Sequence, residues 1–403
     1  MEVTMTRQHN IIFDPIAFKG GSKIATAEAL SLCEPSKVHF TVITCDREFW
    51  QQSALAKVHR VKIVKLPAIP WLREQVHGPL FWLNQVYFTI MLLGCTLLFG
   101  RPHRLIGASG PGVDMPVYLL TWVLKCSVIQ LIHGNVACSR SIGWCLTRAE
   151  RVFYLASTKQ SLLDSLARYY QHKSNSEDSE AQAKSELGKP HFERFVNGIT
   201  DENWPSLSHA EEARCLWAAS LLRWKGLERF ITALRLVHRH QPIYSTICYI
   251  KPKQIKLGVS NAPVDIPLTD WYHDPYNFDQ LRSHCSIFVS TSDNEPFGLS
   301  ILEALAAGMC VVIPNDNSYW DQHLSHGVDC IKYQTGDEAS LANALLLLQQ
   351  NPLTLASIRA QSLLRAEHYH AADRYREIIA AVSTPQWIKS ADLFNVDGVK
   401  KGL

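Results

Sequence analysis

Short runs of apolar and β-branched residues alternate with longer segments of helical periodicity through the first half of the chain. These runs are apolar on both faces, as parallel strands covered by helices on both sides must be. The predicted strands are residues 10–15, 37–44, 60–66, 104–109, 127–133, 151–157 and 192–200, the last ending in a Gly turn. Such strand–helix alternation predicts a doubly wound α/β domain.

The same alternation restarts in the second half of the chain. The predicted strands there are residues 214–220, 244–250, 264–268, 286–292, 310–315 and 329–333. Residues 337–350 and 353–369 have apolar positions at helical spacing. The expected fold is therefore α/β, with two Rossmann-like domains in tandem and a cleft between them. Ligands of such sheets bind at the carboxyl ends of the strands.

Domain limits follow from shifts in composition. We place the N-terminal domain at residues 1–205, the C-terminal domain at 206–365 and a C-terminal helix and tail at 366–403. Residues 171–190 are polar and rich in Ser and Glu, which is typical of a flexible, disordered-type surface insertion. Residues 201–212 are expected to form the interdomain linker.

Composition narrows the class of protein. The 403 residues suffice for two cores, and 47% apolar with 19% charged residues is typical of a globular chain. A formal net charge of +3 gives no electrostatic case for nucleic acid. The 11 cysteines form no CxxC pair and no metal-ligand spacing with His. We interpret them as reduced thiols of a cytoplasmic protein, and the polar N-terminus as no signal peptide.

Residues 78–100 contain no charged side chain and are long enough to span a bilayer. Asn84, Gln85 and Thr89 interrupt the run, and a span would separate two strands of one sheet, so a buried core helix is the favoured interpretation. A helix that dips into a membrane surface remains the third possibility. Its anchors would be the side chains just upstream, namely Lys57, Arg60, Lys62, Lys65, Trp71 and Arg73.

Candidate functional residues follow several predicted strands. Gly20 and Gly21 come after the first strand and could let the backbone approach a ligand, although a plain turn is the better explanation of a Gly pair alone. His133 ends the fifth strand, where a functional and a structural role are equally expected. Arg223 and Lys225 follow the first strand of the second half and precede a helix. Two cations at a helix N-terminus suit a diphosphate.

The stretch DNEPFGLSILEALAAGMCVVIP, residues 293–314, carries two carboxylates around a predicted helix start. Glu295 lies in the loop, and Glu303 lies one turn into the helix among apolar neighbours. Carboxylates accept hydrogen bonds from paired hydroxyls, so both side chains suit recognition of a sugar. Backbone amides at the helix start could bind a phosphate or a sugar hydroxyl. These amides belong to Phe297, Gly298, Leu299 and Ser300.

EPFGLSILEALAAG, residues 295–308, resembles the E-x7-E element of retaining GT-B glycosyltransferases, most closely family 4. RWKG at 223–226 resembles the family's donor-phosphate site, and VNGIT at 196–200 is similar to its turn before the linker. FKGGS at 18–22 and IHG at 132–134 resemble its Gly-rich and His-bearing loops. The resemblance is collinear over roughly residues 10–380 and implies a GT-B fold, with a C-terminal helix that crosses back onto the N-terminal domain.

The resemblance also implies a role for each matched residue. Glu303 would bind the ribose of the nucleotide and Glu295 the hydroxyls of the transferred sugar. Arg223 and Lys225 would neutralise the diphosphate leaving group. The amides of residues 297–300 would meet the sugar and the distal phosphates. His133 would lie near C6 of the donor sugar. Gly20 and Gly21 would form the floor of the cleft.

The implied activity is transfer of a hexose-type sugar, from UDP- or GDP-sugar, to an acceptor hydroxyl with retention of configuration. No cofactor and no metal are expected, because the cations replace the metal. The partners would be the nucleotide sugar and a saccharide or lipid-linked acceptor, in surface polysaccharide or lipopolysaccharide synthesis, in the cytoplasm or on the inner face of its membrane. The alternatives are a sugar-nucleotide epimerase, a phosphorylase or a non-catalytic nucleotide-sugar-binding or membrane scaffold protein.

Two segments depart from the family pattern. Residues 248–261 lack the usual Gly turn and carry Lys251, Pro252 and Lys253, and residues 267–278 lack the Gly where the base docks. The base is therefore left open by the sequence, with Trp271 or Tyr272 as candidate contacts.

Overall fold

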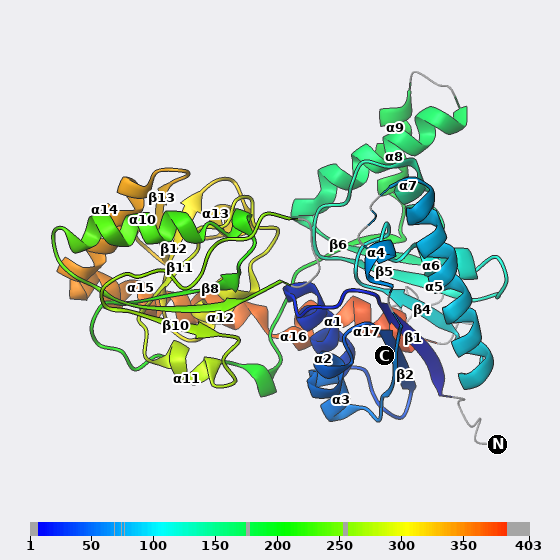
Figure 1. The fold of residues 1–403 in the computed structure, drawn as a ribbon, viewed down its shortest axis with the longest axis horizontal. Coiled ribbons are helices and arrows are strands. Elements are labelled where there is room, and N and C mark those ends of the chain that lie inside the picture. The colour runs from blue at the N-terminus through cyan, green and yellow to red at the C-terminus, as the bar shows by residue number, and fades with distance from the viewer. Residues whose placement is uncertain are drawn as a thin grey trace, which may run out of the picture.

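The computed structural model describes residues 7–384 except 68, 74, 76, 175–177 and 253–256. Two parallel sheets lie side by side, each covered by helices on both faces (Figure 1). The first has seven strands in the order β3-β2-β1-β4-β5-β6-β7, and the second has six in the order β10-β9-β8-β11-β12-β13. This confirms the predicted α/β architecture of two Rossmann-like domains. Lys253, the N-terminal residues 1–6 and the tail 385–403, each interpreted above, lie outside the described residues.

The strands of the first sheet all come from the N-terminal half of the chain. They are β1 (Gln8–Asp14), β2 (Val38–Thr44), β3 (Lys62–Lys65), β4 (Arg104–Gly107), β5 (Ser127–Ile132), β6 (Arg151–Leu155) and β7 (Phe192–Phe195). The strands of the second sheet are β8 (Arg214–Ser220), β9 (Tyr244–Ile250), β10 (Thr269–His273), β11 (Ile287–Val289), β12 (Cys310–Asn315) and β13 (Cys330–Gln334).

Helices connect the strands and form the C-terminal end of the described chain. In the N-terminal half they are α1 (Gly21–Ser31), α2 (Arg47–Gln52), α3 (Ala54–Val58), α4 (Pro70–Arg73), α5 (Gly78–Phe99), α6 (Met115–Leu120), α7 (Arg140–Leu146), η1 (Ala156–Thr158), α8 (Lys159–Ser174) and α9 (Ser179–Leu187). The linker contains η2 (Asp201–Asn203). The remaining ones are η3 (Arg223–Lys225), α10 (Leu227–His238), α11 (Phe278–Ser283), α12 (Leu299–Ala306), α13 (Tyr319–His323), α14 (Glu338–Gln350), α15 (Pro352–Ala366), η4 (Glu367–Tyr369), α16 (Ala371–Arg374) and α17 (Arg376–Ser383).

The strand predicted at residues 264–268 is wrong. The observed strand is β10, which begins directly after that segment at Thr269. Pro263 and Pro267 have no N–H to donate to a neighbouring strand, and Leu268 has a positive φ of 53°. Pairing therefore begins after these residues, where Thr269 lies opposite Ser245 of β9.

The interpretation of residues 171–190 as a disordered-type insertion is also wrong for the part that the structure describes. Helix α8 continues to Ser174, and α9 packs against it. Ala183 and Leu187, four residues apart, are buried on one face of α9. Glu186 is buried as well and accepts a hydrogen bond from the Tyr170 hydroxyl at 2.6 Å. The polar composition reflects the outer face of a helical hairpin.

Helix α5 is only partly the buried core helix favoured from sequence. It is long and apolar enough to cross a membrane, and only 33% of its most apolar stretch is buried. Its buried residues are Asn84, Gln85, Phe88, Leu92, Cys95 and Thr96. The correction is that the interrupting polar residues Asn84 and Gln85 face inward, whereas much of the apolar surface of the helix faces outward.

The chain joins the two domains again near its C-terminal end. The amide of Ile199 donates to Tyr369 O at 3.0 Å, and the amide of Ala371 donates to Ile199 O at 2.9 Å. His370 stacks on Trp204 of the linker with ring centroids 4.3 Å apart. Helices α16 and α17 then contact α1, in the N-terminal domain (Figure 1). One hydrophobic cluster accordingly runs through both domains, from Ile12 in β1 to the residues of α12 and α17.

Gly198 is the tightest point of this junction. A Cβ at this position would lie 2.7 Å from Ala371 Cα and 2.8 Å from Tyr369 O, closer than a real side chain allows. Both contacts are backbone atoms, which have no rotamer with which to move away.

We therefore expect Gly198→Ala to lower the free energy of unfolding by about 1–3 kcal/mol, as overpacking does elsewhere. Gly94→Ala is the matched control, because a Cβ at Gly94 in α5 meets nothing within 4 Å. The control should be neutral or stabilise the protein by about 0.5–1 kcal/mol. Chemical denaturation of both variants measures the difference, and equal stabilities would contradict the tight junction.

Candidate functional site

The predicted site residues all lie in loops or helix starts at the carboxyl ends of strands, where the two sheets approach one another. Gly20 and Gly21 lie between β1 and α1, and a Cβ at Gly21 would sit 3.5 Å from Leu299 Cδ1 at the start of α12. The Ser157 hydroxyl of the N-terminal domain donates to Pro296 O at 2.6 Å. The Gly-rich loop of one domain therefore lies against the Glu-bearing loop of the other.

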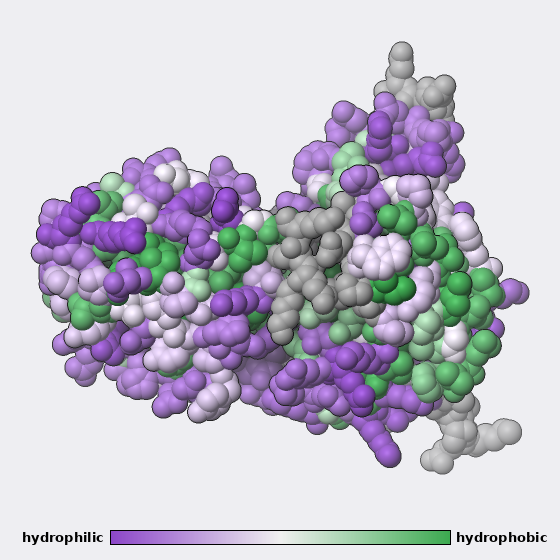
Figure 2. Space-filling view, viewed as in Figure 1, coloured by the Kyte–Doolittle hydropathy of each residue, from purple (hydrophilic) through white to green (hydrophobic). Residues whose placement is uncertain are grey.

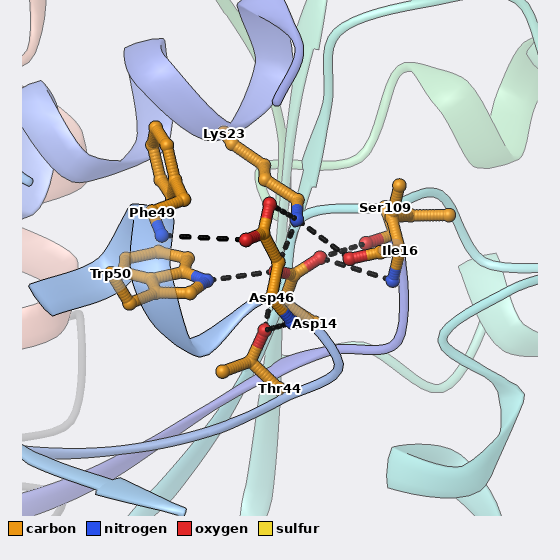
Figure 3. A network of polar contacts seen from close by, with 8 residues as sticks. All are labelled: Asp14, Ile16, Lys23, Thr44, Asp46, Phe49, Trp50 and Ser109. Atoms are coloured by element: carbon orange, nitrogen blue, oxygen red, sulfur yellow. Dashed lines mark hydrogen bonds and ion pairs between the residues drawn. The ribbon is translucent and has the colours of Figure 1, made fainter. Parts of the chain in front are cut away.

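A buried polar network holds the Gly-rich loop in place (Figure 3). Lys23, in the first turn of α1, pairs with Asp14 at 2.9 Å and with Asp46 at 3.1 Å, and all three side chains are largely buried. Lys23 also donates to Ile16 O at 2.6 Å. The Trp50 indole N–H donates to Asp14 Oδ2 at 2.7 Å. One cation thus ties the carboxyl ends of β1 and β2 to the helix that begins at Gly21.

Lys225 and Glu295 form an ion pair that brings together two predicted site residues 70 positions apart in sequence. Their side chains are only 17% and 15% exposed. Lys225 Nζ also lies 4.1 Å from the centroid of the Trp224 ring. The cation expected to bind the diphosphate and the carboxylate expected to bind the sugar are therefore neighbours.

Arg223 lies on the other side of the same turn and is exposed. It lines an open cavity of about 630 Å³ together with Trp224, Gly226, Glu228, Arg229 and Asp293. Its amide donates to Gly258 O at 2.9 Å, which fixes the backbone of η3. The Arg223 guanidinium forms no ion pair within the described residues, so it is available to an anion.

Two contacts that the sequence analysis missed shape this cavity. Arg229 of α10 pairs with both carboxylate oxygens of Asp293 and donates to Thr291 O at 3.2 Å. Gly226 has φ +72°, and a Cβ there would lie 2.2 Å from Thr291 O. Glycine is therefore required for RWKG to pack against the exit of β11.

Glu303 has a different partner from Glu295. Its carboxylate accepts from Arg282 Nη1 at 2.8 Å, and Arg282 also pairs with Asp279 of α11. Burial raises the pKa of Glu303, with Arg282 opposing the shift and Glu28 of α1 adding to it. Glu28 is itself buried and accepts hydrogen bonds from the Thr200 amide at 3.0 Å and from Asn203. Arg282 and Glu28 were not predicted.

The N-terminus of α12 is open. Gly298 is its N-cap with φ 81°, and no side chain caps the helix. Phe297 is buried and packs on Tyr319 and Trp320, with ring centroids at 4.8 Å and 5.3 Å. These ring contacts anchor the loop. The backbone amides of Leu299 and Ser300 belong to the first turn of α12, which lies beside the Gly-rich loop.

His133 lies at the end of β5, as predicted, and contacts α1. Its Nε2 is 3.1 Å from the Thr26 hydroxyl, and its ring packs edge-on against Phe195. Burial lowers the pKa of His133 to about 4, so the imidazole is neutral at pH 7. Its Nδ1 is buried and makes no hydrogen bond within the described residues.

The structure thus brings Lys225 and Glu295 together, whereas Arg223 of the same turn lines an open cavity that includes neither of them. Glu303 and His133 lie in two separate polar networks. Each network includes a residue of α1, namely Glu28 near Glu303 and Thr26 beside His133. Trp271 and Tyr272, the candidate base contacts, lie on β10 and are both half-buried against core clusters. Among the described residues no group of three or more His, Cys, Asp or Glu side chains could hold a metal ion.

The Lys225–Glu295 pair should be strongly coupled. Removing either charge leaves the other largely buried, so a double-mutant cycle of Lys225→Met and Glu295→Gln should give a coupling energy on the order of 1–3 kcal/mol. The cycle is measured by denaturant unfolding.

The Asp373–Arg376 pair of the C-terminal helices is the matched control, because its side chains are 73% and 72% exposed. Its coupling should stay below about 1 kcal/mol. A Lys225–Glu295 coupling as small as that of the control would show that the buried pair does not hold the loop.

Part of the chain is similar to a known protein family and to a curated protein. The family model described as "Glycosyl transferases group 1" matches residues 199–363. A curated relative, "Probable sucrose-phosphate synthase" of Vicia faba, is 29% identical over 113 residues, which are 26% of this chain and 10% of that protein. The chain thus matches about a tenth of the length of this curated relative.

Solved structures resemble nearly the whole chain. Anabaena HepE in complex with UDP-glucose superposes with a TM-score of 0.66 at 15% identity, over 94% of this chain and 100% of that one. The lipopolysaccharide outer core galactosyltransferase WaaB gives a TM-score of 0.58 at 12% identity, over 93% and 99%. At such identities the likeness establishes the fold. The family match is confined to residues 199–363, and the shared fold over nearly the whole chain is the GT-B fold.

Proposed function

We propose that the protein transfers a hexose-type sugar from a nucleoside diphosphate sugar to an acceptor hydroxyl, with retention of anomeric configuration as in family 4. The observation that carries the proposal is the Lys225–Glu295 ion pair between the loops that follow β8 and β11, with the exposed Arg223 in the same turn as Lys225. The turn supplies two cations, and Glu295 lies in the loop that leads to the uncapped N-terminus of α12. A diphosphate joined to a polyol has the complementary charges and hydroxyls.

In the proposed reaction the acceptor oxygen forms a bond to the anomeric carbon while the bond from that carbon to the phosphate oxygen breaks. The acceptor proton passes to the departing phosphate oxygen, so no protein nucleophile is needed. Negative charge develops on the diphosphate, and Arg223, Lys225 and the first amides of α12 stabilise it. Lys225 and Glu295 form an ion pair with each other. In this proposal the donor binds between them, with its phosphates at Lys225 and its sugar at Glu295.

The remaining site residues orient the donor in this proposal. Glu303, held by Arg282, accepts the ribose hydroxyls, and Glu295 accepts hydroxyls of the sugar. His133 is neutral and can offer one ring N–H near C6 of the sugar without adding charge. Gly20 and Gly21 leave room for the acceptor at the start of α1.

Donor, acceptor and location belong to the same proposal. UDP is favoured over GDP because HepE, which shares the fold, forms a complex with UDP-glucose. Trp271 and Tyr272 are the proposed base contacts. Surface polysaccharide or lipopolysaccharide is the proposed acceptor class, which the resemblance to WaaB supports. We place the enzyme in the cytoplasm and expect transfer without metal, since Arg223 and Lys225 supply the positive charge that a metal would bring.

Arg223→Ala should lower kcat/KM for the nucleotide sugar by about 10²–10³, the usual loss when one group that stabilises developing charge is removed. Arg235→Ala is the matched control, since Arg235 is an exposed cation on α10. The assay measures release of nucleoside diphosphate across a panel of nucleotide sugars, with and without EDTA. Equal losses in both variants would contradict the role of Arg223, and loss of turnover in EDTA would contradict metal independence.

Glu295→Gln should reduce turnover by roughly 10² while nucleotide affinity changes little, because the carboxylate contacts the sugar and not the base. Calorimetric binding of UDP and single-turnover transfer separate the two quantities. Equal losses in binding and turnover would contradict the assignment.

The same panel discriminates the alternatives. Conversion of one nucleotide sugar into its epimer without release of the diphosphate would indicate an epimerase. Tight binding of nucleotide sugar with neither release nor conversion would indicate a scaffold. Both outcomes would overturn the transferase proposal.

A further inference from the structure

Helix α5 has a mixed buried side, which includes Asn84 and Gln85, and an exposed side that is largely apolar. Asn84 and Gln85 are 5% and 3% exposed, whereas Leu97 and Leu98 are each 77% exposed. Ile90, midway along the helix, is 62% exposed. A surface helix normally buries its apolar side and leaves polar residues in water. This arrangement suits a helix whose outer side meets an apolar medium.

The exposed side of α5 is part of a larger apolar face, which we define by Leu80, Trp82, Leu83, Val86, Ile90, Leu97 and Leu98 of α5 with Trp122 and Val123 after α6. Figure 2 shows apolar surface gathered over α5 and α6, at the right-hand edge of the molecule away from the C-terminal domain. Trp122 is 68% exposed and packs edge-on against Trp144. Isolated exposed Leu residues are ordinary, but a contiguous face of this kind marks an interaction site.

The fold prevents α5 from crossing a bilayer. The helix connects β3 to β4, and both strands belong to the same seven-stranded parallel sheet. It contacts α4 and α6, and Phe88 packs edge-on against Phe13 of β1. A perpendicular span would withdraw α5 from these contacts and expose Asn84, Gln85 and Thr96 to lipid. The helix can meet a membrane only by lying along it.

Charge around the apolar face is strongly one-sided. Residues 60–150 contain nine Lys or Arg and three acidic residues, of which Asp114 is fully buried and Glu150 pairs with the buried Arg104. Lys62, Arg101 and Lys125 are exposed at the C-terminal end of α5, beside Leu97 and Leu98. Lys62 Nζ lies 3.6 Å from the centroid of the Phe99 ring, and Arg101 donates to Lys125 O. We call these three cations the basic cluster.

We propose that the apolar face and the basic cluster dock the N-terminal domain on an anionic lipid bilayer, with α5 lying in the plane of the interface. Exposed Leu, Ile and Trp side chains enter the boundary between headgroups and acyl chains, and the cations bind acidic headgroups. A second copy of the chain fits this surface less well, because the apolar face contains no acidic side chain that could pair with the basic cluster of a partner. The proposal does not depend on the transferase activity.

Co-sedimentation of the full chain with vesicles tests the proposal. We expect binding to phosphatidylcholine vesicles that contain phosphatidylglycerol, weaker binding at high salt, and little binding to phosphatidylcholine alone. Leu97→Glu with Leu98→Glu should lower partitioning at least about tenfold, because two apolar anchors are lost. Lys62→Gln and Lys125→Gln should each lower it about fivefold.

Leu353→Glu with Leu364→Glu is the matched control, since both leucines lie on α15 of the other domain and are 87% and 61% exposed. It should bind vesicles as the parent protein does. If the Leu97, Leu98 variant does not fold, Ile90→Glu replaces it. Brominated lipid should quench tryptophan fluorescence, and Trp122→Phe should remove part of that quenching.

Four outcomes would overturn the proposal. Absence of vesicle binding is the first, and equal binding to neutral and anionic vesicles is the second. Equal loss of binding in the α15 control is the third. The fourth is retention in the membrane after alkaline carbonate extraction, which would indicate a spanning helix. A dimer in light scattering that dissociates in the Leu97, Leu98 variant, without vesicle binding, would assign the face to a second copy instead.

Discussion

The hydrogen-bonded junction between Ile199 and residues 369–371 is the constraint on which the site depends. The chain leaves the N-terminal domain once and returns once, and both passages are joined here by backbone bonds of 3.0 Å and 2.9 Å. The stacked pair of Trp204 and His370 and the close approach at Gly198 fix the same point. Because a hydrophobic cluster continues through it, the two sheets meet with their carboxyl edges together, and Gly21 reaches Leu299.

The charged side chains at these edges are balanced by one another. Lys225 lies on Glu295, Arg282 on Glu303, and Lys23 between Asp14 and Asp46. Largely buried charges are stable only when paired, and each of these side chains has its counter-charge within the chain. The pairing with Glu295 keeps the Lys225 ammonium oriented within its turn. Arg223 forms no ion pair within the described residues and is exposed beside an open cavity.

The sequence predicted what is local and missed what joins distant segments. Twelve of the thirteen described strands lie where the apolar runs placed them, because periodicity and strand propensity are local properties. The run at 264–268 failed because Pro267 cannot donate within a ladder. Arg229, Arg282 and Glu28 carry no pattern of their own. Their partners lie 64, 21 and 172 residues away, and only the folded chain brings them together.

Helix α5 shows where reasoning from composition fails. Asn84 and Gln85 were taken as evidence for a soluble core helix, and they are indeed buried, but the side that they leave outward is the apolar one. A count of polar residues cannot distinguish a buried core helix from a helix with an exposed apolar side. The distinction depends on the side of the helix on which the polar residues lie. That side is set by Phe88 and Leu92, which pack into the sheet. Since the apolar face lies away from the C-terminal domain, docking through it would hold the N-terminal domain against a surface while the C-terminal domain stays in water (Figure 2).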